Sequence, residues 1–381
     1  MEKPKRILQV FTIMNRGGAE SMIMSYYRNI DRSKVQFDFL VHRFEKGAFD
    51  EEIEQLGGQI FRIAPIPFFN LNKYQKKLDK FFKEHQYNII HSHLNAMSKY
   101  VLKIAKKNNT NTRIAHSHIA LPILSIVNIR EQKLSIIDIF KIFYKNIAKK
   151  NITNYATNYF ACEQKAANWL FNNTSEVHII NNAIDSRQFR YNEEKSHLLK
   201  IKLGLNNKLI FGHVGRFNTQ KNHLFLISIF YEIQKLQPNS ILLLVGDGIL
   251  KAKMIDKVEK LSISNKIVFL GVRSDIPEIL QSFDIFLFPS LFEGLPVTLI
   301  EAQASGLKCF TSNTIDKDVD ISGLINPISL EKSAKEWATI ILENKDYTRK
   351  DQYQTIVKNG YDIKENAKKL ENFYLSQLSK C

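Results

Sequence analysis

Two glutamates in the segment FEGLPVTLIEAQASG (292–306) are the clearest candidates for chemistry in this sequence. Glu293 lies in a loop directly after the apolar run DIFLFPS, and Glu301 follows it with seven residues between them, near the first turn of an expected helix. A loop carboxylate can accept hydrogen bonds from sugar hydroxyls, and the helix carboxylate can accept both hydroxyls of a ribose. The alternatives are an acid–base pair and, for Glu301, an ordinary glutamate that the helix dipole favours.

Two cations upstream suit a diphosphate. Arg216 follows the strand-like run KLIFGHVG, and Lys221 stands five residues later, at the expected start of a helix. A guanidinium and an ammonium that converge over a helix N-terminus bind phosphate well. The G-x-x-x-x-G-K-[ST] spacing of a P-loop is absent, and the alternative is a pair of solvated cations near a turn. Val272, in FLGVRSD at another expected strand end, has backbone groups that could pair with a nucleobase.

A glycine pair follows the first strand-like run of the chain. Gly17 and Gly18, in RGGAE, precede a helical pattern, so the backbone there can approach a ligand and the helix N-terminus can face it. The spacing is not that of the G-x-G-x-x-G dinucleotide motif. A tight strand-to-helix turn without a ligand is the alternative.

Two HSH triplets, His91–His93 and His116–His118, stand at expected strand ends. Imidazoles are common zinc ligands, but no carboxylate or cysteine stands near them in sequence to complete a set, so we expect no metal. His118 is better interpreted as a polar group at the edge of a cleft that hydrogen-bonds a hydroxyl. For each of the four histidines the alternative is a purely structural hydrogen bond.

Strand-like runs alternate with helix-length patterns in both halves of the chain, as in RILQVFTI followed by GGAESMIMSYYRNI. This alternation predicts an α/β protein with parallel sheets covered on both faces, organised as two Rossmann-like domains. We expect an N-terminal domain over 1–183 and a C-terminal domain over 184–363, with a helix at about 364–381 that can pack back onto the first. Ligands of such sheets bind beyond the carboxyl ends of the strands, where the residues named above fall.

The composition indicates a globular protein with an unusual charge. Of the 381 residues 44% are hydrophobic and 24% charged, and the net charge is +16. Residues 73–150 hold 16 basic and 4 acidic residues, a field that attracts nucleic acid, an anionic membrane or phosphorylated substrates. A solvated, Lys-rich surface is the alternative. The start of the chain lacks a signal-peptide core, no apolar run spans a bilayer, and the three cysteines are far apart, so we expect a cytoplasmic protein.

One basic stretch has the pattern of a helix that lies on a membrane. In LSIIDIFKIFYKNIAKKN (134–151) apolar and basic residues interleave. Such a helix can bind the anionic inner face of a membrane peripherally, or it can pack on its own domain. The apolar residues are Ile136, Ile137, Phe140 and Phe143, and the basic ones are Lys141, Lys145, Lys149 and Lys150.

Taken together, these motifs resemble the retaining glycosyltransferases of family 4. The resemblance rests on Arg216 with Lys221, on GDG, FLGVRSDIPEIL and FDIFLFPS, and above all on E-x7-E within FEGLPVTLIEAQASG. These motifs fall within about 205–310, and looser matches (RGGAE, NIIHSH, RIAHSH, IINNAID) extend over nearly the whole chain in the style of bacterial capsule and exopolysaccharide enzymes. The resemblance implies a GT-B fold, in which two Rossmann-like domains face a cleft.

The resemblance also implies roles for individual positions. Arg216 and Lys221 would hold the donor diphosphate, Glu293 the hydroxyls of the donor sugar and Glu301 the ribose. His118 would contact the transferred sugar near its anomeric carbon. The remaining donor-side positions are Gly17, Gly18, Val272, Gly294 and Leu295. No metal and no cofactor are expected, and a D-x-D motif is absent.

The implied activity is transfer of a hexosyl unit, with retention, from a nucleotide sugar that we expect to be UDP-linked. The acceptor would be a glycan or a polyprenyl-diphosphate-linked sugar at the inner face of the membrane. Lys308 stands where many relatives have proline, and the glycine-rich segment usual further downstream is reduced to DKDVDISGLINP. The alternatives are a sugar-nucleotide epimerase of the same fold and a non-catalytic partner subunit. A nucleic-acid-binding protein is disfavoured because binding motifs for nucleic acid are absent.

Overall fold

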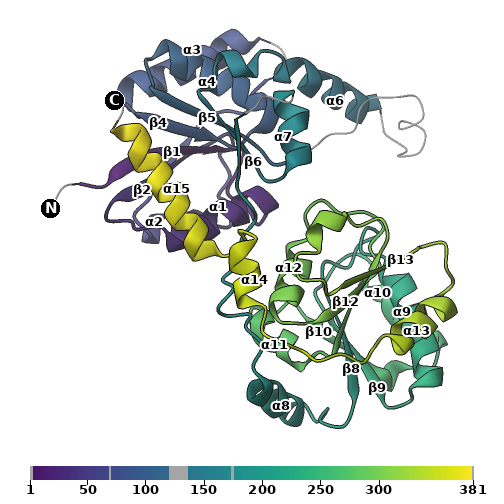
Figure 1. Cartoon of the computed structure of the whole chain (residues 1–381). Coiled ribbons are helices and arrows are strands. Elements are labelled where there is room, and N and C mark those ends of the chain that lie inside the picture. The colour runs from purple at the N-terminus through teal and green to yellow at the C-terminus, as the bar shows by residue number, and fades with distance from the viewer. Residues whose placement is uncertain (1–2, 68–69, 120–135, 173–175, 380–381) are drawn as a thin grey trace. The chain divides into compact units, whose positions relative to one another are not determined.

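The protein forms two compact units, each built on one parallel sheet (Figure 1). Unit 1 comprises Met1–Ala183 with Ile363–Cys381, and unit 2 comprises Ile184–Asp362. The computed structural model describes residues 3–67, 70–119, 136–172 and 176–379, without the side chains of residues 136–141.

The sheet of unit 1 has seven parallel strands in the order β3-β2-β1-β4-β5-β6-β7. The order reverses between β1 and β4, which makes their carboxyl ends the switch point where doubly wound sheets bind ligands. The strands are β1 (Lys5–Phe11), β2 (Val35–Val41), β3 (Ile60–Arg62), β4 (Ile89–Ser92), β5 (Thr112–Ser117), β6 (Asn158–Ala161) and β7 (Val177–Ile179).

Helices cover both faces of this sheet. Ile7 and Phe11 of β1 pack in the core under α1 and α15, whereas Leu8 and Val10 pack in the opposite core under α3 and α4. Burial on both faces explains why the strands are apolar runs without polar alternation. The helices are α1 (Gly18–Asn29), α2 (Asp50–Gln55), α3 (Leu71–Glu84), α4 (Ser98–Lys107), α6 (Ile136–Lys149), α7 (Gln164–Phe171) and α15 (Ile363–Leu378), with 3-10 turns at η1 (Asn95–Met97) and η2 (Ile152–Asn154).

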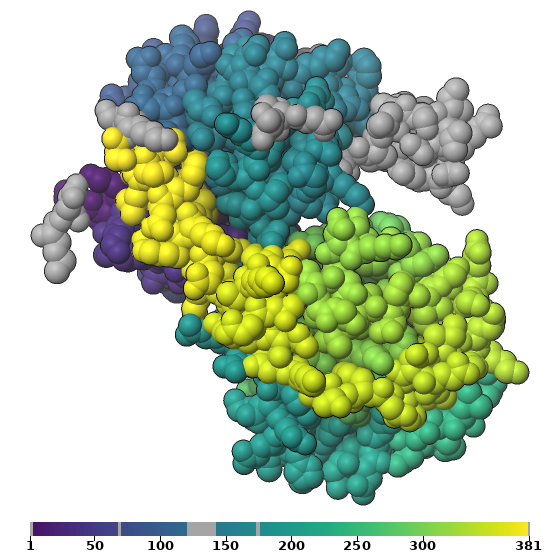
Figure 2. Space-filling view, in the orientation of Figure 1, coloured from purple at the N-terminus to yellow at the C-terminus, as the bar shows by residue number. Residues whose placement is uncertain are grey.

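The last helix of the chain, α15, belongs to unit 1. It packs against α1, β2 and β4, and the space-filling view shows it (yellow) lying on the N-terminal segments (purple) (Figure 2). Its apolar face supplies Ile363, Ala367, Leu370 and Tyr374 to the core that β1 and β2 share. Residues from the two ends of the sequence therefore meet beneath one sheet.

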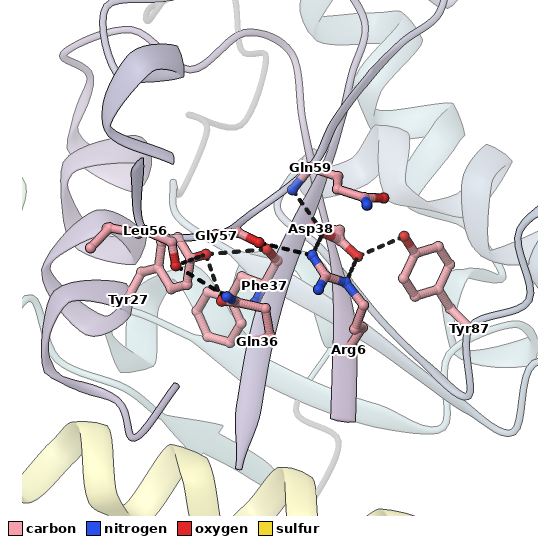
Figure 3. Close-up of polar contacts among 9 residues, drawn as sticks. All are labelled: Arg6, Tyr27, Gln36, Phe37, Asp38, Leu56, Gly57, Gln59 and Tyr87. Atoms are coloured by element: carbon pink, nitrogen blue, oxygen red, sulfur yellow. Dashed lines mark hydrogen bonds and ion pairs between the residues drawn. The ribbon is translucent and has the colours of Figure 1, made fainter. Parts of the chain in front are cut away.

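A buried carboxylate ties β1 to β2 and to the neighbouring loops (Figure 3). Asp38, whose side chain is fully buried, accepts hydrogen bonds from Arg6 Nε at 2.6 Å, Gln59 N at 2.8 Å and Tyr87 Oη at 2.9 Å. A second guanidinium nitrogen of Arg6 completes a bidentate ion pair. The charge of Asp38 is thus compensated, as a buried carboxylate requires.

The sheet of unit 2 has six parallel strands in the order β10-β9-β8-β11-β12-β13. Here the order reverses between β8 and β11, so the second switch point lies at their carboxyl ends. The strands are β8 (Leu209–Val214), β9 (Ser240–Val245), β10 (Ile267–Gly271), β11 (Ile285–Phe288), β12 (Lys308–Ser312) and β13 (Ile325–Ile328).

Unit 2 also has a core on each face of its sheet. Phe286 and Phe288 of β11 face one core, and Ile285 and Leu287 face the other. The helices are α8 (Glu193–Lys202), α9 (His223–Leu236), α10 (Lys251–Lys260), α11 (Ile276–Ser282), α12 (Val297–Ala304), α13 (Ala334–Glu343) and α14 (Tyr353–Lys358), with 3-10 turns at η3 (Ser264–Lys266) and η4 (Lys317–Val319).

The predicted fold class, two parallel α/β sheets, is confirmed, but β12, β13, α13 and α14 were not anticipated. Strand β13 contains Pro327, which a strand tolerates because β13 lies at the edge of the sheet. Helix α13 begins with a capping box between Ser333 and Glu336, a sequence signal that was overlooked. Among the described helices none is long and apolar enough to cross a bilayer.

Candidate active site

Two loops meet at the switch point of unit 2. One follows β8 and carries Arg216 and Lys221, and the other follows β11 and carries Glu293. The backbone N–H of Leu291 donates to the carbonyl oxygen of Gln220 at 2.8 Å, so the loops are joined. Sequence positions more than seventy residues apart are thereby brought together at one sheet edge.

Lys221 and Glu293 form an ion pair within this junction. The distance from Lys221 Nζ to Glu293 Oε1 is 2.8 Å, and the two side chains are only 14% and 7% exposed. Gln220 Nε2 donates to the other carboxylate oxygen at 3.1 Å, and the ammonium lies 4.5 Å from the ring centre of Phe288. The carboxylate and the ammonium are therefore held in place before any ligand binds.

Arg216 has a different environment. Its side chain is exposed and has no hydrogen-bond or ion-pair partner among the described residues, and the next residue, Phe217, is fully buried. Phe217 N donates to Asp247 O at 2.9 Å, which fixes the loop against the turn after β9. Gly246 in that turn has a φ of +135°, and a Cβ there would clash with the carbonyl oxygen of Gly215. The guanidinium is thus presented on a rigid loop.

His213, two residues before Gly215, was not singled out from the sequence. It is fully buried, and its Nδ1 lies 2.7 Å from Leu287 O, so Nδ1 carries the proton and donates. Its Nε2 has no partner within the described residues and would lie 2.9 Å from a Cβ on Gly215. Burial lowers the pKa of His213 well below 6.5 and keeps the ring neutral. The signal available in the sequence was a histidine inside the apolar run LIFGHV.

Glu301 lies on α12, the helix that follows the Glu293 loop. Its side chain has no ion-pair or hydrogen-bond partner in the part of the chain that the structure describes, and burial raises its pKa to about 7. With this pKa the carboxyl of Glu301 is about half-protonated at neutral pH, and its oxygens can accept hydrogen bonds from a ligand. Gly294 is open to solvent, and Leu295 packs partly into the core of unit 2.

Val272 is 75% exposed at the carboxyl end of β10. The neighbouring Arg273 pairs with Asp275 through a 2.8 Å hydrogen bond and leaves the backbone of Val272 uncovered by that side chain. The structure therefore groups Arg216, Lys221 and Glu293 in one junction. Glu301 lies on α12, directly after the Glu293 loop, and Val272 follows β10, which is separated from β8 by β9 in the same sheet.

Unit 1 has its own pocket, of about 730 Å³, beside the switch point of its sheet. Two of the predicted residues, Gly18 and His118, line it together, while Gly17 caps α1 with the carboxylate of Glu20 folded over it. The charged residues of the lining are Glu20, Arg43 and Lys145. Glu20 and Arg43 were not singled out from the sequence, and Lys145 was expected only as part of the basic helix.

The four histidines of the HSH triplets lie in contact at this end of the sheet. Ligand atoms of His91, His93 and His116 lie within 4.8 Å of one another, the spacing of a possible metal set. However, the rings of His91 and His93 are stacked with centres 4.3 Å apart, and those of His116 and His118 are stacked at 4.0 Å. Their nitrogens point along hydrogen bonds to one another and to Gln9 and Tyr374 instead of converging on one point, so the geometry favours a hydrogen-bond network.

These features define a class. Two parallel α/β units, each with polar groups gathered at a switch point, have the architecture of GT-B glycosyltransferases. Anabaena HepE, solved in complex with UDP, matches this fold with a TM-score of 0.74 at 18% identity, over 97% of this chain and 100% of HepE.

Sequence comparison is more specific. Residues 196–317 match the family model "Glycosyl transferases group 1". EpsF of Bacillus subtilis, named as a glycosyltransferase, is 34% identical over 97% of this chain and 96% of its own. CapH of Staphylococcus aureus, named as a capsular polysaccharide biosynthesis glycosyltransferase, is 27% identical over 98% and 99%. The chain belongs to the group 1 glycosyltransferases, also called family 4, and is related to enzymes of bacterial exopolysaccharide and capsule synthesis.

Proposed function

We propose that this glycosyltransferase moves a hexosyl unit from a UDP-sugar to a glycan or lipid-linked sugar, with retention at the anomeric carbon. The observation that carries the proposal is the junction of unit 2, where the Lys221–Glu293 pair lies on the same loops as Arg216, whose side chain has no partner in the described part of the chain. A diphosphate needs cations on a rigid frame, and a hexose needs a fixed carboxylate beside them.

In this account unit 2 binds the donor and unit 1 binds the acceptor. Arg216 and Lys221 bind the diphosphate, and Glu293 accepts hydrogen bonds from hexose hydroxyls. Glu301 accepts the ribose hydroxyls, and Val272 pairs with the base through its backbone. Gly294 and Leu295 offer N–H groups beside Glu293. On unit 1 the N-terminus of α1 at Gly17 and Gly18 lies on the ligand side of the switch point.

The chemical step is a displacement on one face of the sugar. The bond between the anomeric carbon and the diphosphate oxygen breaks, the acceptor oxygen forms the new bond, and the acceptor proton passes to the departing diphosphate. Cations that neutralise the diphosphate stabilise the transition state, because negative charge develops there. His118 hydrogen-bonds the transferred sugar, and no enzyme nucleophile is needed.

Unit 1, which we assign to the acceptor, would bind the membrane surface through α6. On α6, Phe143 is 55% exposed and Ile147 is 45% exposed, one turn apart on the same face, and Lys145 lies between them in sequence. Lys149, by contrast, donates to Trp169 O at 3.0 Å and so packs on its own unit. The side chains of Ile136, Ile137, Phe140 and Lys141 lie outside the described residues. An exposed apolar pair on a basic helix supports peripheral binding to anionic lipid, where a polyprenyl-diphosphate acceptor would reside.

A panel of nucleotide sugars tests the proposal. Thermal unfolding is measured with each candidate donor, since a ligand that binds the folded state raises the unfolding temperature with its affinity. We expect UDP-hexoses to raise it more than GDP- or ADP-hexoses. Donors that bind are then incubated with lipid-linked and free sugar acceptors, and the anomeric configuration of the product is read by NMR. Inverted product, isomerised donor, or binding without any transfer would contradict the proposal.

A further inference from the structure

A continuous set of polar side chains crosses the face of the unit 1 sheet that α1 and α15 cover. Gln9 projects from β1 between Ile7 and Phe11. His91 and His116 come from β4 and β5, and His93 and His118 come from the loops directly after these strands. Tyr374, from α15, joins them and is fully buried. The members are Gln9, His91, His93, His116, His118 and Tyr374, and all are joined by hydrogen bonds.

One branch of this set runs from Gln9 to His118. Gln9 Oε1 lies 2.9 Å from His93 Nε2, and an amide oxygen only accepts, so Nε2 of His93 carries the proton. His93 Nδ1, then a bare lone pair, lies 2.9 Å from His118 Nε2, which must donate to it. His118 Nδ1 is therefore unprotonated. Within the described residues His118 makes hydrogen bonds only through its Nε2 and its backbone N–H, which leaves Nδ1 available as an acceptor.

The other branch runs from the same amide to His116. Gln9 Nε2 donates to Tyr374 Oη at 3.2 Å, and the hydroxyl proton goes to His91 Nδ1 at 2.7 Å. His91 Nε2 then donates to His116 Nδ1 at 3.0 Å. The tautomer of every ring thus follows from the orientation of one amide, and turning that amide over would reverse both branches.

We infer that Gln9 and Tyr374 are positioning residues that hold His118 as its Nε2–H tautomer, so that its Nδ1 accepts a hydrogen bond from a ligand hydroxyl in the unit 1 pocket. The role of His118 in sugar transfer rests on the proposed function, whereas its tautomer does not. Tyr374 anchors the amide because its oxygen accepts from Gln9 while its proton is committed to His91. Helix α15, through Tyr374, thereby helps to keep Nδ1 of His118 free to accept a hydrogen bond in the unit 1 pocket.

Burial of the four histidine rings keeps them uncharged. His91, His93 and His116 are at most 4% exposed, and desolvation lowers the pKa of each of the four rings well below 6.5. Each ring then has one N–H and one lone pair, so that its two nitrogens are chemically distinct.

The test is the tautomer of His118, read by two-bond ¹H–¹⁵N correlation on the full chain labelled with ¹⁵N-histidine. The signals are assigned by their loss in His118→Gln. We expect one tautomer, Nε2–H, in the wild type. Gln9→Met removes both anchors and should give a mixture at His118. Gln9→Glu retains an acceptor for His93, so His118 should stay Nε2–H.

Two further variants separate this effect from damage to the core. Tyr374→Phe frees the Gln9 amide and should also mix the tautomers of His118, whereas Tyr27→Phe removes a buried hydroxyl that bonds Gln36 and should leave His118 unchanged. A wild type with Nδ1–H, or an unchanged single tautomer in Gln9→Met and Tyr374→Phe, would overturn the inference. Because the spectra need no substrate, a failure to detect sugar transfer would count against the proposed function alone.

Discussion

At the residue scale, we propose that different side chains at the unit 2 junction contact different parts of the donor. Glu293 is the residue that holds both Lys221 and, through its other oxygen, Gln220. Glu301, one helix further, is a carboxyl with a raised pKa and no partner in the described chain. The first is held by an ion pair with Lys221, whereas burial raises the pKa of the second to about 7. Their contrast argues against an acid–base pair and for two separate contacts with one donor.

Glu293→Gln should separate sugar binding from nucleotide binding. The amide cannot accept as strongly from hexose hydroxyls, so we expect the dissociation constant of a UDP-hexose to rise about tenfold, the effect of losing a charge-assisted hydrogen bond. The dissociation constant of UDP should change little, because Arg216 and Lys221 remain. Calorimetric titration with both ligands measures the difference. An equal loss for UDP and UDP-hexose would refute this role.

Glu301 should make donor binding depend on pH. Burial raises its pKa to about 7, and only the ionised form accepts from both ribose hydroxyls, so affinity for a UDP-hexose should increase as pH rises through 7 and level off above it. In the absence of donor the pH dependence has the opposite sign. Because the pKa of Glu301 is raised on folding, its contribution to the free energy of unfolding is present at low pH and is lost as pH rises towards 7. Glu301→Gln should bind weakly with a flat pH profile and should unfold at a higher temperature than wild type at pH 8. A wild-type titration that is flat from pH 6 to 8 would contradict the assignment.

At the scale of elements, the sequence predicted the strands and helices that a short continuous run of residues identifies. Apolar strands followed by glycine turns identified β8, β9, β10 and β11, and the E-x7-E spacing placed Glu301 on the helix after β11. Strand β13 was missed because its proline and short length give no strand pattern until its neighbour β12 is known. Pairings between distant segments could not be predicted either. The Lys221–Glu293 contact depends on the order of the strands, and the Gln9–Tyr374 contact depends on where α15 packs on the sheet.

The pairing of β1 with β2 should depend on Asp38. Asp38→Ala leaves Arg6 without its partner and Tyr87 and Gln59 without their acceptor, so we expect a loss of about 3–5 kcal/mol in the free energy of unfolding. Urea unfolding measures it. Glu232→Ala, which breaks an exposed pair with Lys235, is the control and should be neutral. UDP affinity of the folded Asp38→Ala protein should be retained, because Arg216 and Lys221, which we propose for the diphosphate, belong to unit 2. A loss of that affinity would show that our separation of the units is wrong.

At the scale of the whole molecule, two sheets carry two different sites on one chain. Unit 2 holds the cations and carboxylates that we propose for the donor, and unit 1 holds a histidine network and a pocket of about 730 Å³. The net charge of +16 is concentrated in the first half of the sequence, which includes α6. Charge and exposed apolar side chains thus coincide on the unit that we assign to the acceptor.

We expect the basic charge and the exposed apolar side chains of α6 to bind unit 1 to anionic membranes. We expect the protein to co-sediment with vesicles that contain anionic lipid and to be released by high salt, because the attraction between charges is screened. The double variant Phe143→Ser with Ile147→Ser should bind several-fold more weakly. Ile249→Ser, which removes an 87% exposed side chain from unit 2, should bind like wild type. Sedimentation that is independent of lipid charge would exclude this mode of binding.

The central claim is that the loop junction of unit 2 binds the donor diphosphate, and a calorimetric titration of UDP into wild type and Lys221→Ala tests it most directly. Removal of the ammonium takes away half of the cationic pair and leaves Glu293 buried without its counter-ion. We predict that wild type binds UDP and that Lys221→Ala binds it at least about 10-fold more weakly, because a hydrogen bond between charged groups contributes about 1.5–3 kcal/mol. Lys235→Ala, whose ammonium pairs with Glu232 on the surface of α9, should bind UDP like wild type. Equal affinity of wild type and Lys221→Ala for UDP would contradict the account.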